Sequence, residues 1–142
     1  ATKSSYIDGK SKTYGKPISD ISGKPQYDAA TANWGSSWRM PTKVEFQELV
    51  DNCTWTWSTQ SEKEGFIITS KKNGNKIFLP AAGFRNVTNL IGAGERCVYW
   101  MSTHHENYAN YVYMLDFSEE IQEIYPLGPC FGLTIRPVTK IK

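Results

Sequence analysis

The sequence predicts an α+β domain, and three observations lead to that prediction. Two segments with helical character come first, within residues 28–53. After residue 52 the apolar period changes from helical to alternating, and β-forming residues dominate. Helices followed by a run of antiparallel strands are typical of the α+β class. A chain of 142 residues fits one such domain, which buries about two thirds of its unfolded surface.

The first residues differ in composition from the rest. Residues 1–26 are rich in Lys, Ser, Gly and Pro and show little periodicity. We expect an N-terminal arm or long loop there, followed by the folded domain over residues 27–142. Because the chain starts at Ala1 rather than at Met, we expect a piece processed or excised from a longer protein.

Both predicted helices have capping signals. Asp28 is a good cap for a short helix that runs to about Trp34, where the residues Gly-Ser-Ser at 35–37 end it. Thr42 and Glu45 form a capping box at the start of a second helix. Apolar residues then follow at helical spacing, at Phe46, Leu49, Val50 and Cys53. One face of the second helix is therefore expected to pack against a core.

Turn signals divide the β-rich part of the chain. Asn73-Gly74 favours a hairpin, and residues 85–96 are predicted to be a glycine-bearing loop. The predicted strands are residues 53–59, 65–70, 76–79, 98–102, 111–117 and 131–137, with a further short strand at 121–125. We expect these strands to pair in antiparallel fashion.

Tryptophan is concentrated early in the chain. Four of the five tryptophans lie in one block, at positions 34, 38, 55 and 57. A sugar-binding platform is one interpretation of this block. A structural role is the favoured one, because buried aromatic rings contribute strongly to a core of this size. Arg39 is expected to stack on a tryptophan or to pair with Glu45.

Several function classes find little support. The net charge is +2 and the Lys and Arg residues are scattered, so we expect no nucleic-acid partner. No apolar run approaches the ~20 residues that span a bilayer. His104, His105 and Glu106 are consecutive, and three consecutive ligands rarely converge on a metal ion without a turn. The Glu119-Glu120 pair is better explained by surface charge than by acid–base catalysis. We expect no cofactor and no catalytic residue.

The three cysteines leave two interpretations open. Cys53, Cys97 and Cys130 contain no close-spaced pair, which excludes the usual zinc-knuckle and redox spacings. One disulfide with one thiol left over is possible, and Cys97 with Cys130 is then the pair to test, because each precedes a predicted late strand. Three buried free thiols are the alternative.

A candidate binding segment follows the predicted strand at 98–102. Residues 103–113 read THHENYANYVY, and their Tyr and His side chains offer large amphipathic surfaces with few rotatable bonds. We expect Tyr113 to pack in the core more readily than Tyr108. For the two histidines, a solvated loop tip is the alternative to a binding role.

Four blocks of sequence occur in a characteristic order. They are YDAATANWGSSWRMPTKVEFQELVDNCTWTW, NGNKIFLPAAGFRN, VYWMST and FGLTIRPV, and they extend over residues 27–138. Together they resemble the Fibrobacter succinogenes major paralogous domain family, which occurs in surface-associated proteins of Bacteroidetes-type gut bacteria. The resemblance implies a C-type lectin-like fold, with two helices packed on twisted antiparallel sheets, close to the formylglycine-generating-enzyme branch.

The resemblance also implies a function. It suggests a non-enzymatic extracellular or cell-surface recognition module, secreted or carried as a bacterial lipoprotein, that binds a glycan or protein ligand through residues 103–112 and 118–130. The candidate ligand-binding residues are His104, His105, Glu106, Asn107, Tyr108, Tyr111, Glu119, Gln122 and Tyr125.

The sequence departs from that family in three respects. The family's N-terminal strand is expected to be missing, which leaves an open sheet edge where a neighbouring subunit could donate a strand. A structural or assembly domain of a surface protein or fibre is therefore the alternative function. The calcium-dependent sugar motifs of C-type lectins and the paired catalytic cysteines of formylglycine-generating enzymes have no counterpart, and a degenerate enzyme of that type is the least favoured reading.

Overall fold

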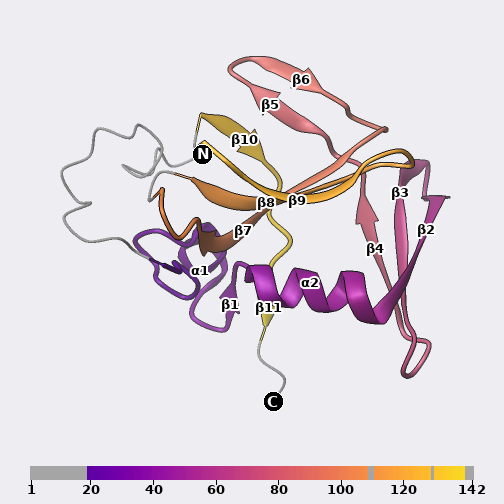
Figure 1. Ribbon diagram of the computed structural model, residues 1–142, viewed down its shortest axis with the longest axis horizontal. Coiled ribbons are helices and arrows are strands. Elements are labelled where there is room, and N and C mark those ends of the chain that lie inside the picture. Colours follow the sequence, from indigo (N-terminus) through magenta and orange to yellow (C-terminus); the bar gives the residue numbers. More distant parts are fainter. Residues whose placement is uncertain (1–18, 109–110, 129, 140–142) are drawn as a thin grey trace.

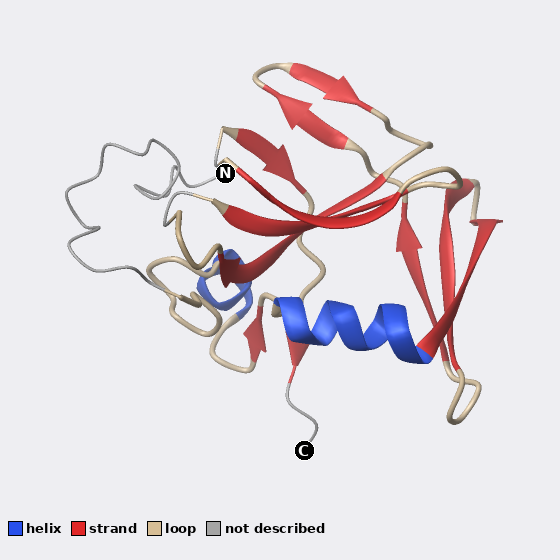
Figure 2. Ribbon diagram, in the orientation of Figure 1, coloured by secondary structure: helices blue, strands red, loops and turns tan. Residues whose placement is uncertain are grey.

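The computed structural model describes residues 19–108, 111–128 and 130–139, and within them it confirms an α+β architecture (Figures 1 and 2). The helices are α1 (Ala29–Trp34) and α2 (Lys43–Asn52). The strands are β1 (Trp38–Arg39), β2 (Cys53–Gln60), β3 (Lys63–Ser70), β4 (Lys76–Pro80), β5 (Phe84–Asn86), β6 (Asn89–Ile91), β7 (Cys97–His104), β8 (Val112–Phe117), β9 (Gln122–Leu127), β10 (Phe131–Leu133) and β11 (Val138–Thr139).

The strands form small antiparallel sheets. Their orders are β2-β3-β4, β7-β8-β9, β10-β5-β6 and β1-β11. In Figure 1, α2 runs along one side of the β7-β8-β9 sheet and leads directly into β2, while the β5–β6 hairpin projects on the opposite side of the molecule. The helix and two of the sheets thereby enclose the main core.

Both capping predictions are confirmed. The Asp28 carboxylate accepts hydrogen bonds from the backbone N–H groups of Ala30 and Thr31 at 2.9 and 3.1 Å. Thr42 and Glu45 form the complete capping box of α2, with each side chain bonded to the other residue's backbone N–H. These contacts satisfy amide donors that the first turn of a helix leaves without partners.

The main core lies between α2 and the two larger sheets. Phe46 is buried on α2, and Leu49, Val50 and Cys53 are partly buried against the same cluster, which confirms the predicted apolar face. The buried members of this cluster are Phe46, Phe66, Ile68, Leu79, Ala81, Cys97, Tyr99, Met101, Tyr113, Leu115 and Phe117. The prediction that Tyr113 packs in the core is thus confirmed.

Six of the predicted strands are confirmed with bounds that differ by at most two residues, namely β2, β3, β4, β7, β8 and β9. The expected loop at 85–96 contains the β5–β6 hairpin, in which Asn86 pairs with Asn89. Its turn places Val87 at φ +57°, a conformation that β-branched residues rarely adopt, so the usual glycine signal is missing. Only residues 131–133 of the expected strand at 131–137 form a strand, β10, and the short strand β11 begins just after the expected range, at Val138.

The predicted N-terminal arm over residues 1–26 lies mostly outside the described residues. Its last part, residues 19–26, packs against β7 and the segment that follows α1. Asp20 forms an antiparallel bridge with Thr103, and the buried Ile21 donates its N–H to the Ser102 carbonyl at 3.1 Å. This part of the predicted arm therefore belongs to the folded domain.

Candidate recognition site

The end of β7 sets the position of the predicted binding segment. Trp100 pairs with Met114 and His104 pairs with Val112, so β7 advances by more residues than β8 between these two pairs. Such a bulge redirects the side chains that follow it. His104 is only 3% exposed, and its N–H donates to the Ser19 carbonyl at 2.9 Å. His104, one of the predicted ligand-binding residues, is therefore buried in this structure, because residues at the start of the described chain lie beside it.

The segment after β7 is folded back on itself by its own backbone. The N–H of His105 donates to the Tyr111 carbonyl at 2.9 Å, and the N–H of Tyr111 donates to the Tyr108 carbonyl at 2.9 Å. The N–H of Asn107 donates to Nδ1 of the His105 ring at 3.1 Å. These bonds fix the His105 ring and bring its neighbours in the sequence close to it.

Aromatic rings from this segment and from β8 form a connected group. Tyr113 is 8% exposed and stacks on His105, with ring centroids 5.8 Å apart at an interplanar angle of 27°. His105 contacts Tyr108 at 5.2 Å, and Tyr108 contacts Tyr111 at 5.9 Å. Tyr108 and Tyr111 are 63% and 44% exposed. We call these four residues, His105, Tyr108, Tyr111 and Tyr113, the aromatic cluster. It runs from a buried anchor to an exposed surface.

One cation and one anion contact the buried anchor of the cluster. Lys43 Nζ lies 3.8 Å from the centroid of the Tyr113 ring, and the Tyr113 hydroxyl donates to Glu106 Oε2 at 3.0 Å. A hydrogen bond from its own backbone N–H, and then the one from Tyr113, lower the pKa of Glu106. Glu106 therefore presents a carboxylate at neutral pH, beside the ammonium of Lys43.

Sequence reasoning did not single out Lys43. It is the first residue of α2, and its backbone N–H donates to Thr103 Oγ1 at 3.0 Å, which joins the start of this helix to the end of β7. The helical pattern alone predicts only that Lys43 faces away from the core. Its place beside Tyr113 depends on a contact across 60 residues of sequence, for which the chain gives no local signal.

The predicted residues Glu119, Gln122 and Tyr125 do not join the aromatic cluster. The cluster lies where β7 passes into β8, whereas Glu119 lies where β8 passes into β9. These turns are at opposite ends of β8, whose 6 residues span roughly 20 Å. The two predicted binding segments, residues 103–112 and 118–130, therefore do not form one surface in this structure. The predicted strand at 111–117 lies between the two segments in the sequence, and its extended length is the signal that they are far apart in space.

Glu119 lines a separate hollow of about 420 Å³. Its carboxylates come from Glu64, Glu95, Glu119 and Glu120, and the Trp57 ring forms part of the wall. Arg96 also lines this hollow, but its guanidinium makes two hydrogen bonds to the buried Asp116, and this pairing raises the pKa of Arg96.

Tyr125 and Gln122 have different surroundings. The Tyr125 hydroxyl donates to Asp116 Oδ2 at 3.0 Å, so this side chain is half-buried and engaged within the β7-β8-β9 sheet. Gln122 is exposed at the start of β9. Of the predicted set, His105, Glu106, Asn107, Tyr108 and Tyr111 are therefore the residues that lie together.

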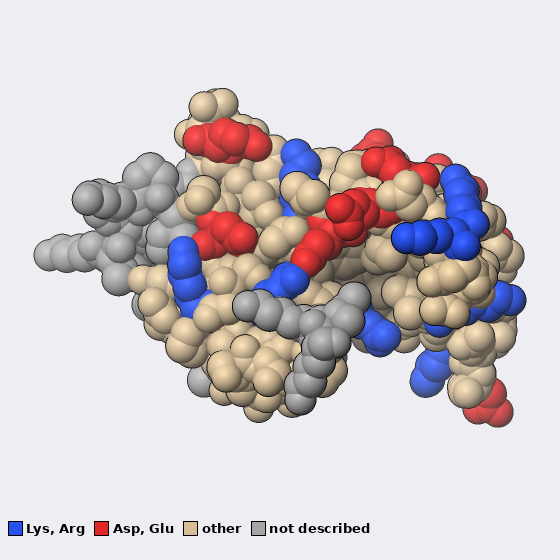
Figure 3. Space-filling model, turned by 90° about the horizontal axis from the view of Figure 1, so that it is seen from below, with Lys and Arg blue, Asp and Glu red and all other residues tan. Residues whose placement is uncertain are grey.

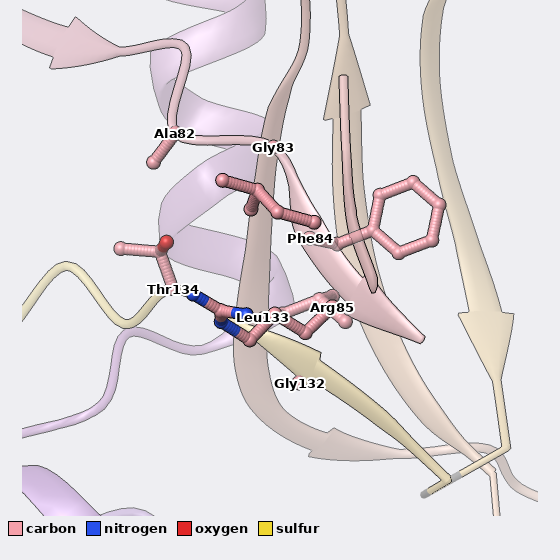
Figure 4. A pocket seen from close by; sticks show the side chains of 8 residues that line it. Ala82, Gly83, Phe84, Arg85, Gly132, Leu133 and Thr134 are labelled. Carbon is pink, nitrogen blue, oxygen red and sulfur yellow. The ribbon is translucent and has the colours of Figure 1, made fainter. Parts of the chain in front are cut away.

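A second hollow, of about 280 Å³, lies on the small sheet formed by β5, β6 and β10. Figure 4 shows residues that line it, among them Phe84 and Arg85 of β5, Leu133 of β10, and Thr134, which follows β10. Arg85 Nη1 donates to the Thr88 carbonyl at 3.3 Å, within the hairpin itself. This hollow contains none of the residues that the sequence predicts for ligand binding.

The cysteines are free thiols in the structure. Cys97 is buried, Cys53 is intermediate and Cys130 is exposed. Cys97 lies in the main core, where its Sγ donates to the Leu79 carbonyl at 3.3 Å. The predicted Cys97–Cys130 bridge is thus not formed in this structure.

The two halves of the tryptophan block differ in exposure. Trp55 and Trp57 pack on Phe66 with ring centroids 5.6 and 5.0 Å apart, as expected for structural residues. Trp34 and Trp38 are 58% and 40% exposed, which contradicts the favoured structural role for that pair. Arg39 makes paired hydrogen bonds to Glu45, so the predicted pairing is confirmed.

Charged residues of both signs are interspersed on the face of the molecule in Figure 3. In the part of the chain that the structure describes, no three His, Cys, Asp or Glu side chains are placed to hold a metal ion. No helix in the same residues is long and apolar enough to cross a membrane. No protein-family model matches the chain, and comparison with curated proteins and with solved structures finds no significant match.

Proposed function

We propose that this chain is a non-enzymatic recognition module that binds a glycan or protein ligand through the aromatic cluster. The observation that carries the proposal is the exposure of Tyr108 and Tyr111 on a support of stacked rings. Most exposed side chains are free to move, whereas the Tyr108 ring contacts His105, which is itself held by Tyr113, and the Tyr111 ring contacts Tyr108. A surface that is held in place loses less entropy when a ligand binds.

The chemistry of the cluster suits recognition. Tyrosine has an apolar ring and a polar hydroxyl, and it brings a large contact area with few rotatable bonds. Lys43 and Glu106 add one charge of each sign beside Tyr113. A ligand is thus offered two ring faces, with an ammonium and a carboxylate nearby to orient it.

We also propose a fold family and a cellular location for this protein. We assign the chain to a C-type lectin-like fold of the Fibrobacter succinogenes major paralogous domain type. Four motif blocks, two helices and small antiparallel sheets support this assignment. A module of this type acts outside the cell or on the cell surface, which for this chain means a secreted protein or a bacterial lipoprotein.

A double variant tests the proposed site. Replacing Tyr108 and Tyr111 by Ala removes both exposed rings, while Tyr113 keeps the buried anchor in place. We expect retention on a glycan array, or capture of bacterial-surface proteins in a pull-down, to fall by roughly tenfold or more.

The matched control is a Glu119→Ala/Gln122→Ala variant, which changes exposed residues at the opposite end of β8. It should bind like the parent, and circular dichroism should show both variants to be folded. Binding that survives in the Tyr variant and is lost in the control would move the site to the other end of the sheet.

An assembly function is the second candidate, and the β5–β6 hairpin favours it. All three residues of β6 are exposed, and among the described residues this strand pairs with β5 alone. Val87 and Leu90 are 84% and 53% exposed. An apolar strand with a free edge can accept a strand from another chain.

Light scattering over a range of protein concentrations separates the two functions. Assembly through β6 predicts oligomers that a Leu90→Lys variant abolishes, because a charged edge strand resists pairing. A parent protein that remains monomeric at the highest concentration contradicts assembly and leaves the recognition function as the proposal.

A further inference from the structure

We propose that the turn between α1 and β1 is a second binding site, and that it takes an uncharged oligosaccharide. We call residues 34–38 the Trp turn, because Trp34 and Trp38 are its two ends. This site is distinct from the aromatic cluster and does not depend on it.

The exposure of the two indoles is the first observation. α1 buries only Ala30 and Thr31, so the small residues of this helix face inward and Trp34 faces solvent. Burial of a large aromatic side chain stabilises a fold by about 2 kcal/mol or more. Residues 32–38 are all exposed, and the two tryptophans in this run leave part of that stabilisation unused. Exposed aromatic side chains of this size are candidates for contact with a ligand.

The turn brings the two tryptophans close together. The N–H of Gly35 donates to the Thr31 carbonyl at 3.0 Å and ends the helix. The N–H of Trp38 donates to the Gly35 carbonyl at 3.0 Å and closes the turn. A closed turn places its first and last Cα atoms within about 7 Å, and adjacent Cα atoms are about 3.8 Å apart. The two tryptophan Cα atoms are therefore within about 11 Å of each other, a span suited to neighbouring sugar rings.

Gly35 is needed for this geometry. Its φ of +91° and ψ of 174° place it in a region of backbone conformation that essentially only glycine adopts. A side chain at this position would have open space around it, so the requirement for glycine comes from the backbone and not from packing. The sharp exit from α1 is what brings the backbone of Trp38 on β1 near that of Trp34 on the helix.

Buried side chains hold both ends of the turn. Asp28 is fully buried, and its Oδ1 accepts from Ala30 and Thr31 at the start of α1. Its Oδ2 accepts from the N–H of Met40, just after β1, at 2.9 Å. Thr31 Oγ1 donates to the Trp38 carbonyl at 2.8 Å. The turn is thus tied to the body of the domain before any ligand arrives, which reduces the entropy lost on binding.

The absence of charge indicates the class of ligand. Residues 29–38 read AATANWGSSW and contain no charged side chain. The neighbouring Arg39 is paired with Glu45 through both of its terminal nitrogens. Single-stranded nucleic acid also stacks on aromatic rings, but its backbone requires a positively charged groove. An uncharged sugar ring instead has an apolar C–H face for an indole and hydroxyls for polar partners, and Asn33, Ser36 and Ser37 are exposed beside the two rings.

The test uses an array of neutral, sialylated and sulfated oligosaccharides. We expect the parent protein to retain neutral oligosaccharides, and the best of them then serves as the probe in calorimetric titration. A Trp34→Ala/Trp38→Ala variant should bind this probe on the order of tenfold or more weakly. An Ile77→Ala variant, which changes an exposed apolar residue on β4, is the control and should bind it as the parent does.

A second variant keeps the test decisive if the Ala variant does not fold. In Trp34→Phe/Trp38→Phe the other three tryptophans remain. Addition of the probe should therefore shift tryptophan emission in the parent and not in this variant.

Three results would overturn the proposal. These are no retention of any neutral oligosaccharide, unchanged affinity in a folded Trp34→Ala/Trp38→Ala variant, and an emission shift that persists in the Phe variant. Loss of probe binding in the Tyr108→Ala/Tyr111→Ala variant alone would place the sugar on the aromatic cluster. In that case the Trp turn would be wrong and the proposed function of the cluster would be supported.

Discussion

The pair Trp34 and Trp38 and the pair Trp55 and Trp57 lie in one stretch of sequence and have opposite surroundings. Trp55 and Trp57 are two residues apart on β2, so both point to the face of the sheet that carries Phe66. Trp34 lies on a short helix that buries only the small residues Ala30 and Thr31, and Trp38 lies on a short strand in which neither residue is buried. A dense group of aromatic residues therefore does not by itself specify a core. Whether such a residue is buried depends on the side chains that other parts of the chain pack against it.

Replacement of Trp55 by Ala should have the largest effect. The Trp55 ring lies 4.6 Å from Phe117, and its Nε1 donates to the Leu49 carbonyl at 3.0 Å. The variant loses these contacts and leaves a cavity between α2, β2 and β8. We expect the free energy of unfolding to fall by about 3 kcal/mol, measured by chemical denaturation.

The Trp34→Ala variant is the control for that measurement. Because Trp34 is exposed and makes no core contact of this kind, its free energy of unfolding should change by no more than about 0.5 kcal/mol. Equal losses in the two variants would contradict the division of the tryptophan block into a core half and a surface half.

Asp28→Ala should have the next largest effect on stability, because this buried carboxylate bonds to residues on both sides of the Trp turn, at the start of α1 and just after β1. It accepts four backbone hydrogen bonds, from Gly23, Ala30, Thr31 and Met40. Its removal leaves several buried donors without an acceptor, which we expect to lower the free energy of unfolding by about 2–3 kcal/mol.

Oligosaccharide binding at the Trp turn should weaken in the Asp28→Ala variant as well, even under conditions where circular dichroism shows it to be folded. Asp28→Asn keeps an acceptor oxygen and should give an intermediate loss of stability. If Asp28→Ala were as stable as the parent, the carboxylate would not be what ties the turn to the domain.

Local signals in the sequence predicted the parts of the fold that depend on neighbouring residues. The Asp28 cap and the capping box at Thr42 need only a side chain and an amide a few residues away, so their spacing in sequence is sufficient. The strands β2, β3 and β4 follow from alternation and from the Asn73-Gly74 turn. The β5–β6 hairpin was missed because Val87 occupies a turn position that normally carries glycine or asparagine.

The candidate site was predicted only in part, since it depends on contacts between distant segments. The aromatic composition of residues 103–113 indicated Tyr108 rather than Tyr113 as an exposed ring, which is confirmed, and it left core packing of Tyr111 open. The burial of His104 results from a bulge in β7 and from the packing of Ser19, and neither has a local sequence signal. The exposure of Trp34 was missed for a related reason. A tryptophan is assigned to the core by its chemistry, while the partner that would cover it has to come from elsewhere in the chain.

A smaller effect is expected at Glu45, which joins the strand end of the Trp turn to α2. The hydrogen bonds from Arg39 are the main cause that lowers the pKa of Glu45. A carboxyl group whose pKa is lower in the folded state stabilises the fold above its unfolded pKa of about 4.3. This contribution disappears as the pH falls through the folded-state value.

Glu45→Gln should therefore cost about 1 kcal/mol at pH 7, since the pair is partly exposed to solvent. Urea denaturation at pH 7 and at stepwise lower pH measures the difference, which should shrink in the acid range. Glu48→Gln, on the exposed face of α2, is the matched control and should show little difference at either pH. A difference for Glu45→Gln that is the same at all pH values would mean that the ion pair does not stabilise this end of the turn.

The smallest effect on stability is expected at the cysteines, and their reaction with an alkylating reagent is the measurement. As with the tryptophans, one cysteine is buried and another is exposed. Burial raises the pKa of the Cys97 thiol to about 12, so little reactive thiolate forms near neutral pH. Cys130 is exposed. In the native, non-reduced protein we expect alkylation at Cys130 within minutes and at Cys97 only after unfolding, as mapped by mass spectrometry of peptides. A Cys130→Ser variant should lose the fast reaction without a measurable change in the free energy of unfolding.

If neither Cys97 nor Cys130 is alkylated after unfolding without reductant, the two are joined by the disulfide that the sequence suggested. The protein would then have met an oxidising compartment, which is the condition that a surface or secreted location requires.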